Sequence, residues 1–281
     1  MIRFGPAGNS ESFYNQGYTR TAEAPKWINQ MGLNAFEYPF VRGVNMSDDT
    51  ALILAEQAKL YNIEFSVHSP YYVNFASTNE ELVLKSFNYI MQCLHTLKIM
   101  GGKRIVIHSG SLTKQMRIDA YNNVKKRFTE LIEMVYSGGY GDMLLCPETM
   151  GRTSYIGSVD EIVEICKIDK CIVPTFDFGH INAITNGSLK TKNDFRKVID
   201  KAFDAIGERA KNMHIHFSKI EYGLKGEIRH LTMADTIYGP EFAPLAEILH
   251  EYKMTPFIIS ESGGTMAEDA LLLKQIYESI K

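Results

Sequence analysis

Short apolar runs alternate with longer amphipathic stretches along the whole chain. The apolar runs are the length of buried strands, and the amphipathic stretches place apolar residues at helical spacing. Eight strand–helix pairs are predicted in succession. The predicted strands are residues 2–4, 35–38, 64–68, 104–108, 143–148, 172–177, 212–216 and 256–261. The helices after them are predicted near residues 21–31, 47–61, 80–100, a long helix that ends at 138–139, 158–168, 193–206, 241–252 and 266–280.

Residues that favour helix ends support several of these boundaries. Ser47 is a good N-cap, with Asp48 and Asp49 in the first helical turn that follows. Glycine pairs at 101–102 and 138–139 stop the two longest helices, because glycine adopts the left-handed conformation common at helix C-termini.

Eight βα units of near-equal length, without a low-complexity linker, predict an α/β protein with one domain over residues 1–281, a (β/α)₈ TIM barrel. A doubly wound open sheet is the alternative. The two longest connections without predicted regular structure are residues 182–191 and 218–240. Both leave from the carboxyl ends of strands, which suits binding loops or lids.

Composition and charge set broad limits on function. The 281 residues are 45% hydrophobic and 22% charged, which is ordinary for a globular protein. A formal net charge of −3 excludes the globally basic profile of a non-specific nucleic-acid binder. A local basic face or bound metal ions could still attract phosphate.

The cysteines and the amino terminus indicate the compartment. Cys93, Cys146, Cys166 and Cys171 show no CxxC spacing and read as buried apolar thiols in a reducing environment. The chain enters a predicted strand directly at residue 2, and no apolar run of about 18 residues occurs. We therefore expect a cytoplasmic protein without a membrane partner.

Side chains that can bind metal gather where the predicted strands end. One histidine at a strand end is more often a hydrogen-bonded rim residue than a ligand, but the carboxyl ends of all strands in a parallel barrel meet at one rim. An array at these ends therefore predicts a multinuclear metal site. Those at strand ends are His68, His108, Glu148, Asp177, His214 and Glu261, and those just beyond are His180, Glu227 and His230.

The donor types indicate which metals would fit. Imidazole nitrogens combined with carboxylate oxygens suit Zn²⁺, and also Mn²⁺ or Fe²⁺. Asp177 and His180 stand three residues apart, and Gly179 between them would permit a tight turn that points them at neighbouring ions. Glu148 is a natural bridge between two ions, because a carboxylate has two oxygens.

These motifs resemble those of the endonuclease IV family of AP endonucleases over nearly the whole chain. The resemblance implies a (β/α)₈ barrel with three zinc ions, of which one position could take Mn²⁺ or Fe²⁺. The matching segments are residues 66–71 (SVHSPY), 106–111 (VIHSGS), 147–151 (PETMG), 177–180 (DFGH), 213–219 (MHIHFSK) and 259–261 (ISE).

The resemblance also implies which residues would bind each ion and what the enzyme does. A monomer would hydrolyse the phosphodiester 5′ to an abasic site in double-stranded DNA, with Glu261 and Glu148 holding or orienting the attacking hydroxide. The implied ligand sets are His68 with His108, Asp177 with His214 and Glu261, and His180 with Glu227 and His230, with Glu148 bridging the first two sets.

The chain departs from the family pattern at two motifs. The family has Asp-x-His where this chain has Glu227-Ile-Arg-His230, a longer carboxylate on a longer spacing that could still reach the same ion. The family continues its last histidine motif with Asn-Asp, whereas His216 follows His214 here. His216 is either a hydrogen-bonding residue that orients a ligand or a direct ligand.

Two residues match, to different degrees, family residues that open duplex DNA at the lesion. Tyr71 follows the first histidine motif, and Arg42 follows the second predicted strand. Either could be an ordinary surface residue. The sequence has no basic patch interleaved with aromatics that would by itself predict DNA binding.

A sugar isomerase or epimerase built on the same barrel is the main alternative, since fold alone does not separate these chemistries. Such a site holds one ion with four donors drawn from carboxylates and histidines. Glu148, Asp177, His214 and Glu261 would suffice for it, and the remaining histidines would have no role as ligands. Their presence favours the endonuclease. A third class, a non-catalytic metal-dependent nucleic-acid binder, has no positive feature in the sequence.

Overall fold

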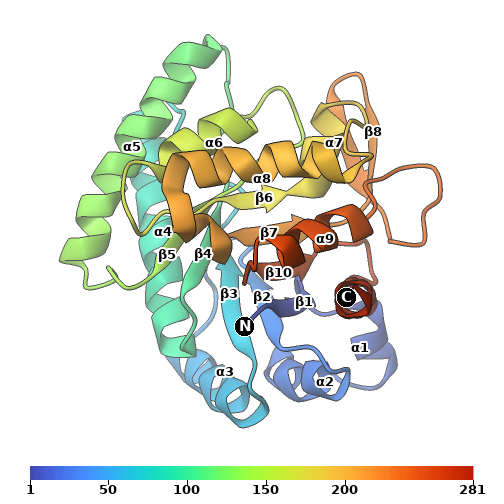
Figure 1. Cartoon of the computed structure of the whole chain (residues 1–281). Helices are drawn as coiled ribbons and strands as arrows, with labels where there is room; N and C mark the ends of the chain where they lie inside the picture. Colours follow the sequence, from blue (N-terminus) through green and yellow to red (C-terminus); the bar gives the residue numbers. More distant parts are fainter. Residues whose placement is uncertain (281) are drawn as a thin grey trace.

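Eight parallel strands form the wall of a barrel in the computed structural model, which describes residues 1–280 (Figure 1). Seven of them begin and end within two residues of a predicted strand, and the sixth is shorter than predicted. The barrel strands are β1 (Arg3–Pro6), β2 (Ala35–Pro39), β3 (Glu64–His68), β4 (Arg104–Ile107), β5 (Leu144–Pro147), β6 (Thr175–Asp177), β7 (His214–Phe217) and β10 (Phe257–Ser260).

Parallel pairing closes the strands into a barrel. One four-stranded sheet has the order β1-β10-β7-β6 and the other β2-β3-β4-β5. Parallel bridges join the two sheets at both edges, from Ala7 to Glu37 and from Glu148 to Thr175. The predicted (β/α)₈ barrel is therefore confirmed, and the open doubly wound sheet is excluded.

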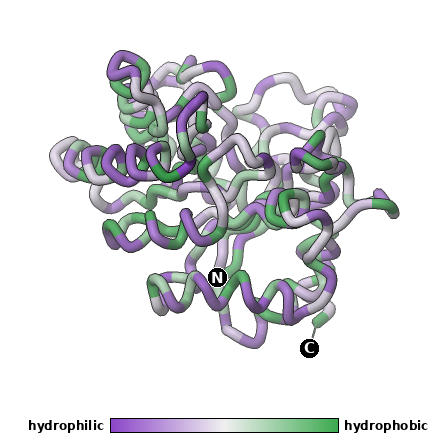
Figure 2. Tube along the Cα trace, turned by 90° about the horizontal axis from the view of Figure 1, so that it is seen from above, coloured by the Kyte–Doolittle hydropathy of each residue, from purple (hydrophilic) through white to green (hydrophobic). Residues whose placement is uncertain are grey.

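Helices surround the barrel, and Figure 2 shows hydrophobic and hydrophilic residues alternating along them. Ser47 caps α3 as predicted, with its hydroxyl accepting a hydrogen bond from Thr50 N at 3.3 Å. Gly101 ends α4 in the left-handed conformation, with φ of 76°. The outer helices are α1 (Glu11–Asn15), α2 (Ala24–Gln30), α3 (Asp48–Tyr61), α4 (Glu80–Met100), α5 (Arg117–Ser137), α6 (Val159–Cys166), α8 (Lys192–Ile206), α9 (Ala243–Glu251) and α10 (Met266–Ser279). Short 3₁₀ helices lie at Thr21–Glu23 and Gly207–Asn212.

The hydrophobic core lies mainly between the strands and the helices. It includes Phe36 and Phe65, which are both buried and meet edge to face with ring centroids 5.9 Å apart. All four cysteines are buried, as the sequence predicts. Two small separate clusters, one around Ile259 and one around Val106, make up the other buried apolar groups. Polar side chains occupy much of the space inside the barrel, where TIM barrels usually stack apolar ones.

Two elements at the carboxyl rim differ from the prediction, which had loops there. Residues Phe178–Ile184 form helix α7, because the Asp177 carboxylate accepts a hydrogen bond from His180 N at 2.8 Å and caps it. Gly179 lies in this helix rather than in a turn, and a Cβ there would come within 2.6 Å of the Ser218 carbonyl oxygen. Strands β8 (Ile220–Gly223) and β9 (Gly226–His230) form an antiparallel hairpin beside α7 (Figure 1).

Candidate metal centre

A pocket of about 380 Å³ opens at the carboxyl rim of the barrel. Its floor and walls carry histidines and carboxylates from β3, α7, β9 and the ends of β4, β5 and β10. Within the described residues, donor atoms close enough to share an ion form three groups at this rim and one deeper group inside the barrel. Glu148 and His216 each belong to two groups.

The first rim group contains His68, His108 and Glu148. Glu148 Oε2 lies 3.3 Å from His68 Nε2 and 2.8 Å from His108 Nε2. His68 Nδ1 donates to the Ser69 carbonyl oxygen at 2.8 Å, which leaves the lone pair of Nε2 facing the carboxylate. The structure thus brings together the residues that the sequence assigns to the first ion.

The second rim group contains Glu148, Asp177, Glu261 and His216, and not His214 as the sequence analysis expects. His216 Nδ1 lies 2.9 Å from Glu148 Oε1 and 3.4 Å from Glu261 Oε2. The structure places His214 in the deeper group instead, with Glu37 and His216. Of the two roles left open for His216, the geometry matches a direct ligand.

Strand register explains the exchange of the two histidines. His214 and His216 both point into the barrel, because side chains alternate along a strand with a period of two. His216 is level with Asp177 of β6, whereas His214 pairs with Thr175 and Phe257 and lies roughly 6–7 Å deeper along the strand. Only the later histidine reaches the rim.

The third rim group contains His180, Glu227 and His230. Glu227 Oε2 lies 3.4 Å from His180 Nε2, and Glu227 Oε1 lies 3.9 Å from His230 Nε2. His180 Nδ1 contacts the Thr149 carbonyl oxygen at 3.0 Å, and His230 Nδ1 contacts the Ser218 hydroxyl at 2.9 Å. The longer Glu-x-x-His spacing still brings both side chains to one point, because the hairpin register shifts between Glu227 and Arg229.

The comparisons with known proteins place the chain in a family. A family model described as "xylose isomerase-like TIM barrel" matches residues 25–276. The chain belongs to this family. An uncharacterized protein of Methanocaldococcus jannaschii is 32% identical over 283 residues, which cover 100% of this chain and 98% of that protein. A probable endonuclease 4 of Thermosipho melanesiensis is 29% identical over 71% of this chain and 73% of its own.

Solved structures of the same fold belong to proteins with different named activities. Endonuclease IV from Thermus thermophilus superposes with a TM-score of 0.70 at 17% identity, covering 99% of this chain and 98% of that one. A D-tagatose 3-epimerase-like protein also gives a TM-score of 0.70, at 22% identity over 88% of this chain and 87% of its own. Membership of this TIM barrel family makes the chain a member of an enzyme superfamily, and these likenesses show the fold alone.

The deepest group contains Glu37, which the sequence analysis does not single out, together with His214 and His216, which it does. Glu37 lies in the middle of β2, fully buried, between His214 and His216. Its one sequence signal is a charged residue inside the apolar run Ala35-Phe36-Glu37-Tyr38, which the strand prediction passed over. A buried charge is costly unless it is paired, so such a residue marks a partner inside the barrel.

The two residues compared with DNA-contacting residues of the endonuclease IV family lie in different settings. Tyr71 lines the pocket, half-exposed, with its ring centroid 5.2 Å from both His68 and His108. Arg42 is exposed on the turn after β2, next to Val41, which lines an adjoining hollow. Arg152 also lines the pocket and donates through Nε to the Glu227 carbonyl oxygen at 3.1 Å.

The electrostatics of the pocket depend on mutual pairing of buried groups. Burial alone would raise the pKa of the Glu148 carboxyl, but His216 and His108 hold that pKa well below its usual range. Burial raises the pKa of Asp177 to about 6 against the opposing effect of His180. Burial opposes charging of His180, yet Asp177 and Glu148 raise its pKa to about 9.

These donors fit divalent metal ions. Carboxylate oxygens and imidazole nitrogens without a thiolate in any group match catalytic rather than structural zinc sites. Asp177 Oδ2 is buried without a hydrogen-bond partner among the described residues, which is costly for a carboxylate unless a cation approaches it. Clustered groups that could bind metal are thus a feature of this fold's rim.

The described helices show no membrane-spanning character. None is both long and apolar enough to cross a bilayer.

Proposed function

We propose that this protein is a metal-dependent AP endonuclease, which hydrolyses the phosphodiester 5′ to an abasic site in double-stranded DNA. The observation that supports this most is the number of metal-capable groups in one pocket, three at the rim. The relatives named probable endonuclease 4 are consistent with it.

The number of donors separates this proposal from a sugar epimerase, the activity named for other structures of this fold. An epimerase of the kind considered above needs one ion and four donors, and Glu148, Asp177, His216 and Glu261 form such a set. It leaves five further residues without a role. Those residues are His68, His108, His180, Glu227 and His230, and they form two more groups around the same pocket.

The donor types favour zinc at all three positions, with Mn²⁺ or Fe²⁺ able to occupy one of them. Zinc ions bound there would supply Lewis acidity to phosphate oxygens and make water a stronger acid near neutral pH.

Glu148 and Glu261 are the proposed catalytic carboxylates. Glu261 is the more accessible, with its side chain 16% exposed to the pocket, against 1% for Glu148. Burial opposes ionisation of Glu261, but the charge of His216 lowers its pKa to about 2, so it is ionised at neutral pH. Its oxygen can therefore accept a hydrogen bond from the attacking water and orient it.

The pocket walls suit a sugar without its base. At about 380 Å³ the pocket is at the small end of ligand sites, which is the size range for a deoxyribose phosphate turned out of a helix. The Tyr71 ring at the mouth could stack against the neighbouring base, and Arg152 offers a cation for a phosphate. Arg42 is a second proposed DNA contact. We propose that the enzyme acts as a monomer.

The decisive experiment is cleavage of a duplex oligonucleotide that carries one abasic-site analogue, by protein of measured metal content. We expect incision 5′ to the lesion that is lost on chelation and restored by zinc. The Glu261→Gln variant should retain its fold and lose at least about a hundredfold in turnover, because the charge that orients the attacking water is lost.

The epimerase alternative makes the opposite prediction in the same assay. In that case the metal-loaded protein would leave the abasic duplex intact and would interconvert ketose epimers. This result would overturn the nuclease proposal in favour of a sugar epimerase. Duplex without the lesion is the control for non-specific cleavage.

A further inference from the structure

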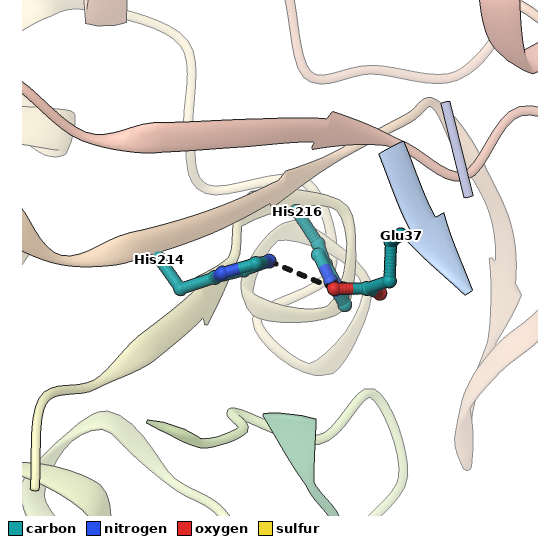
Figure 3. Close-up of side chains that lie close together, drawn as sticks. All are labelled: Glu37, His214 and His216. Atoms are coloured by element: carbon teal, nitrogen blue, oxygen red, sulfur yellow. Dashed lines mark ion pairs between the residues drawn. The ribbon is translucent and has the colours of Figure 1, made fainter. Parts of the chain in front are cut away.

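The Glu37 carboxylate lies beneath the rim groups, outside every group to which a catalytic role is assigned above. Figure 3 shows His214 and His216, from β7, directed at this one carboxylate from β2. Glu37 Oε1 lies 3.0 Å from His216 Nε2, and Glu37 Oε2 lies 3.1 Å from His214 Nε2. All three side chains are buried completely.

The hydrogen-bond partners of the rim histidines explain the contact between His216 and Glu37. In three of them one ring nitrogen faces a rim carboxylate, while the other contacts a neutral oxygen of the protein. Those oxygens are the Ser69 carbonyl for His68, the Thr149 carbonyl for His180 and the Ser218 hydroxyl for His230. A histidine ligand needs such a partner, because the group on one nitrogen fixes the ring orientation and leaves the lone pair of the other for the ion.

His216 has a carboxylate in that position instead of a neutral oxygen. Its Nδ1 faces Glu148 and Glu261 at the rim, and its Nε2 faces Glu37 in the interior. When an ion at the rim takes the lone pair of Nδ1, the one remaining ring proton of His216 would stay on Nε2, where the Glu37 carboxylate attracts it.

We propose that Glu37 is a positioning residue for the metal centre, which holds His216 in the tautomer and orientation that direct Nδ1 at the rim. The inference rests on the proposed metal centre and not on the proposed DNA substrate. It also gives His214 a role, since this second imidazole would pair with the other oxygen of Glu37 and keep the carboxylate in place.

The surroundings of Glu37 support a fixed carboxylate. Ser66 Oγ donates to Glu37 Oε2 at 2.8 Å from the neighbouring strand β3. Ser66 from β3 and the two imidazoles of His214 and His216 from β7 thus restrain the carboxylate beneath one rim histidine.

A metal ion shared by Glu37, His214 and His216 is the competing arrangement. Among the described residues, Glu37 Oε1 and His216 Nε2 have no partner with in-line hydrogen-bond geometry. A carboxylate oxygen and an imidazole nitrogen that bind the same ion also lie close together without in-line hydrogen-bond geometry. This alternative adds a fourth ion, so counting ions distinguishes it.

The test is a zinc titration of the full-length protein against a competing chelator, with the ions per chain counted after gel filtration. For the wild type we expect three ions. For Glu37→Gln we expect one of the three affinities to fall about 10- to 100-fold, while the other two stay unchanged. When Co²⁺ replaces zinc, the variant should lose affinity for the same ion. The visible absorption of one of the three Co²⁺ ions should then be weaker than in the wild type.

Two further variants serve as comparisons. Asp48→Asn breaks a carboxylate–histidine pair on the surface, 3.2 Å from Asp48 Oδ1 to His95 Nε2, and should leave all zinc affinities unchanged. Glu37→Asp keeps the negative charge but moves it away from the two imidazole rings, so it should lower the affinity for the same single ion. It replaces Glu37→Gln if that variant fails to fold.

The outcomes are distinct. A folded Glu37 variant with all zinc affinities unchanged, or with all of them reduced equally, overturns the positioning role. Four ions in the wild type and three in the variant overturn it in favour of the deep ion. A wild type that binds no zinc sinks the metal centre itself, whereas three tight ions without incision of abasic DNA would count against the substrate alone.

Discussion

At the scale of single residues, the sequence-based site and the site in the structure differ in which of two histidines on one strand joins the second rim group. The sequence places His214 and His216 on the inner face of the same strand, and the motif alone favours the first. Depth along the barrel decides which one reaches Asp177, and depth depends on pairing with strands far away in sequence. The sequence could therefore predict the rim and most of its donors, but not this choice.

Gly151 leaves the space that the His180 and Glu227 side chains of the third rim group occupy. A Cβ at Gly151 would lie 2.7 Å from His180 Cδ2 and 2.8 Å from Glu227 Cβ. Gly151→Ala must push both side chains apart, so we expect zinc at this group to bind at least about tenfold more weakly. Overpacking should also lower the free energy of unfolding by about 1–3 kcal/mol.

The control lies in the same part of the rim. A Cβ at Gly223 would meet only Ile228 Cδ1, at an ordinary 3.5 Å, so Gly223→Ala should leave zinc binding unchanged. The measurement is the zinc affinity of each site by competition titration. Equal affinities in Gly151→Ala and the wild type would mean that His180 and Glu227 do not share an ion.

At the scale of elements, prediction succeeded where the signal is local. Eight strands and the helices that cover them follow from apolar periodicity and from caps such as Ser47. Helix α7 and the β8–β9 hairpin were missed, because neither has a long apolar period. The first depends on a cap from Asp177 and on the close approach of Ser218 to Gly179, and the second packs against α7.

A cap at the start of α6 predicts a pH-dependent stability. Glu161 accepts hydrogen bonds from Ser158 N at 2.9 Å and Gly157 N at 3.0 Å, and Arg117 holds both of its oxygens at 2.8 and 2.7 Å. Burial would raise the Glu161 pKa, but Arg117 and the two backbone amides lower it below 4.5 overall. We expect Glu161→Gln to cost about 1–2 kcal/mol of stability at pH 7.

The sign of the pH dependence follows from that lowered pKa. The carboxylate stabilises the fold fully above its unfolded pKa, and this contribution is lost as the pH falls through the lower folded pKa. The difference between wild type and Glu161→Gln in urea unfolding should therefore shrink below about pH 4.5. Glu164→Gln, an exposed change on the same helix, is the control and should have little effect at either pH.

At the scale of the whole molecule, polar and charged side chains of the site occupy part of the barrel interior. Glu37, Glu148, Asp177, His214 and His216 are all completely buried, where apolar side chains would usually fill the barrel. Buried charges are costly, and pairing between carboxylates and imidazoles offsets only part of that cost. Metal ions that bind the folded state alone should therefore account for a substantial share of its stability.

Metal removal tests this directly. An ion present at a hundredfold excess over its dissociation constant stabilises the fold by about 2.7 kcal/mol, so three sites together give roughly 8 kcal/mol. Each kcal/mol raises the unfolding temperature of a protein of this size by about 2–4 °C, so a chelator at constant pH should lower it by more than about 10 °C. Zinc should restore it. Glu148→Gln, which removes the carboxylate shared by two rim groups, should show a much smaller response to the chelator. An unfolding temperature that chelator leaves unchanged in zinc-loaded wild type would mean that the buried carboxylates and histidines satisfy one another without ions.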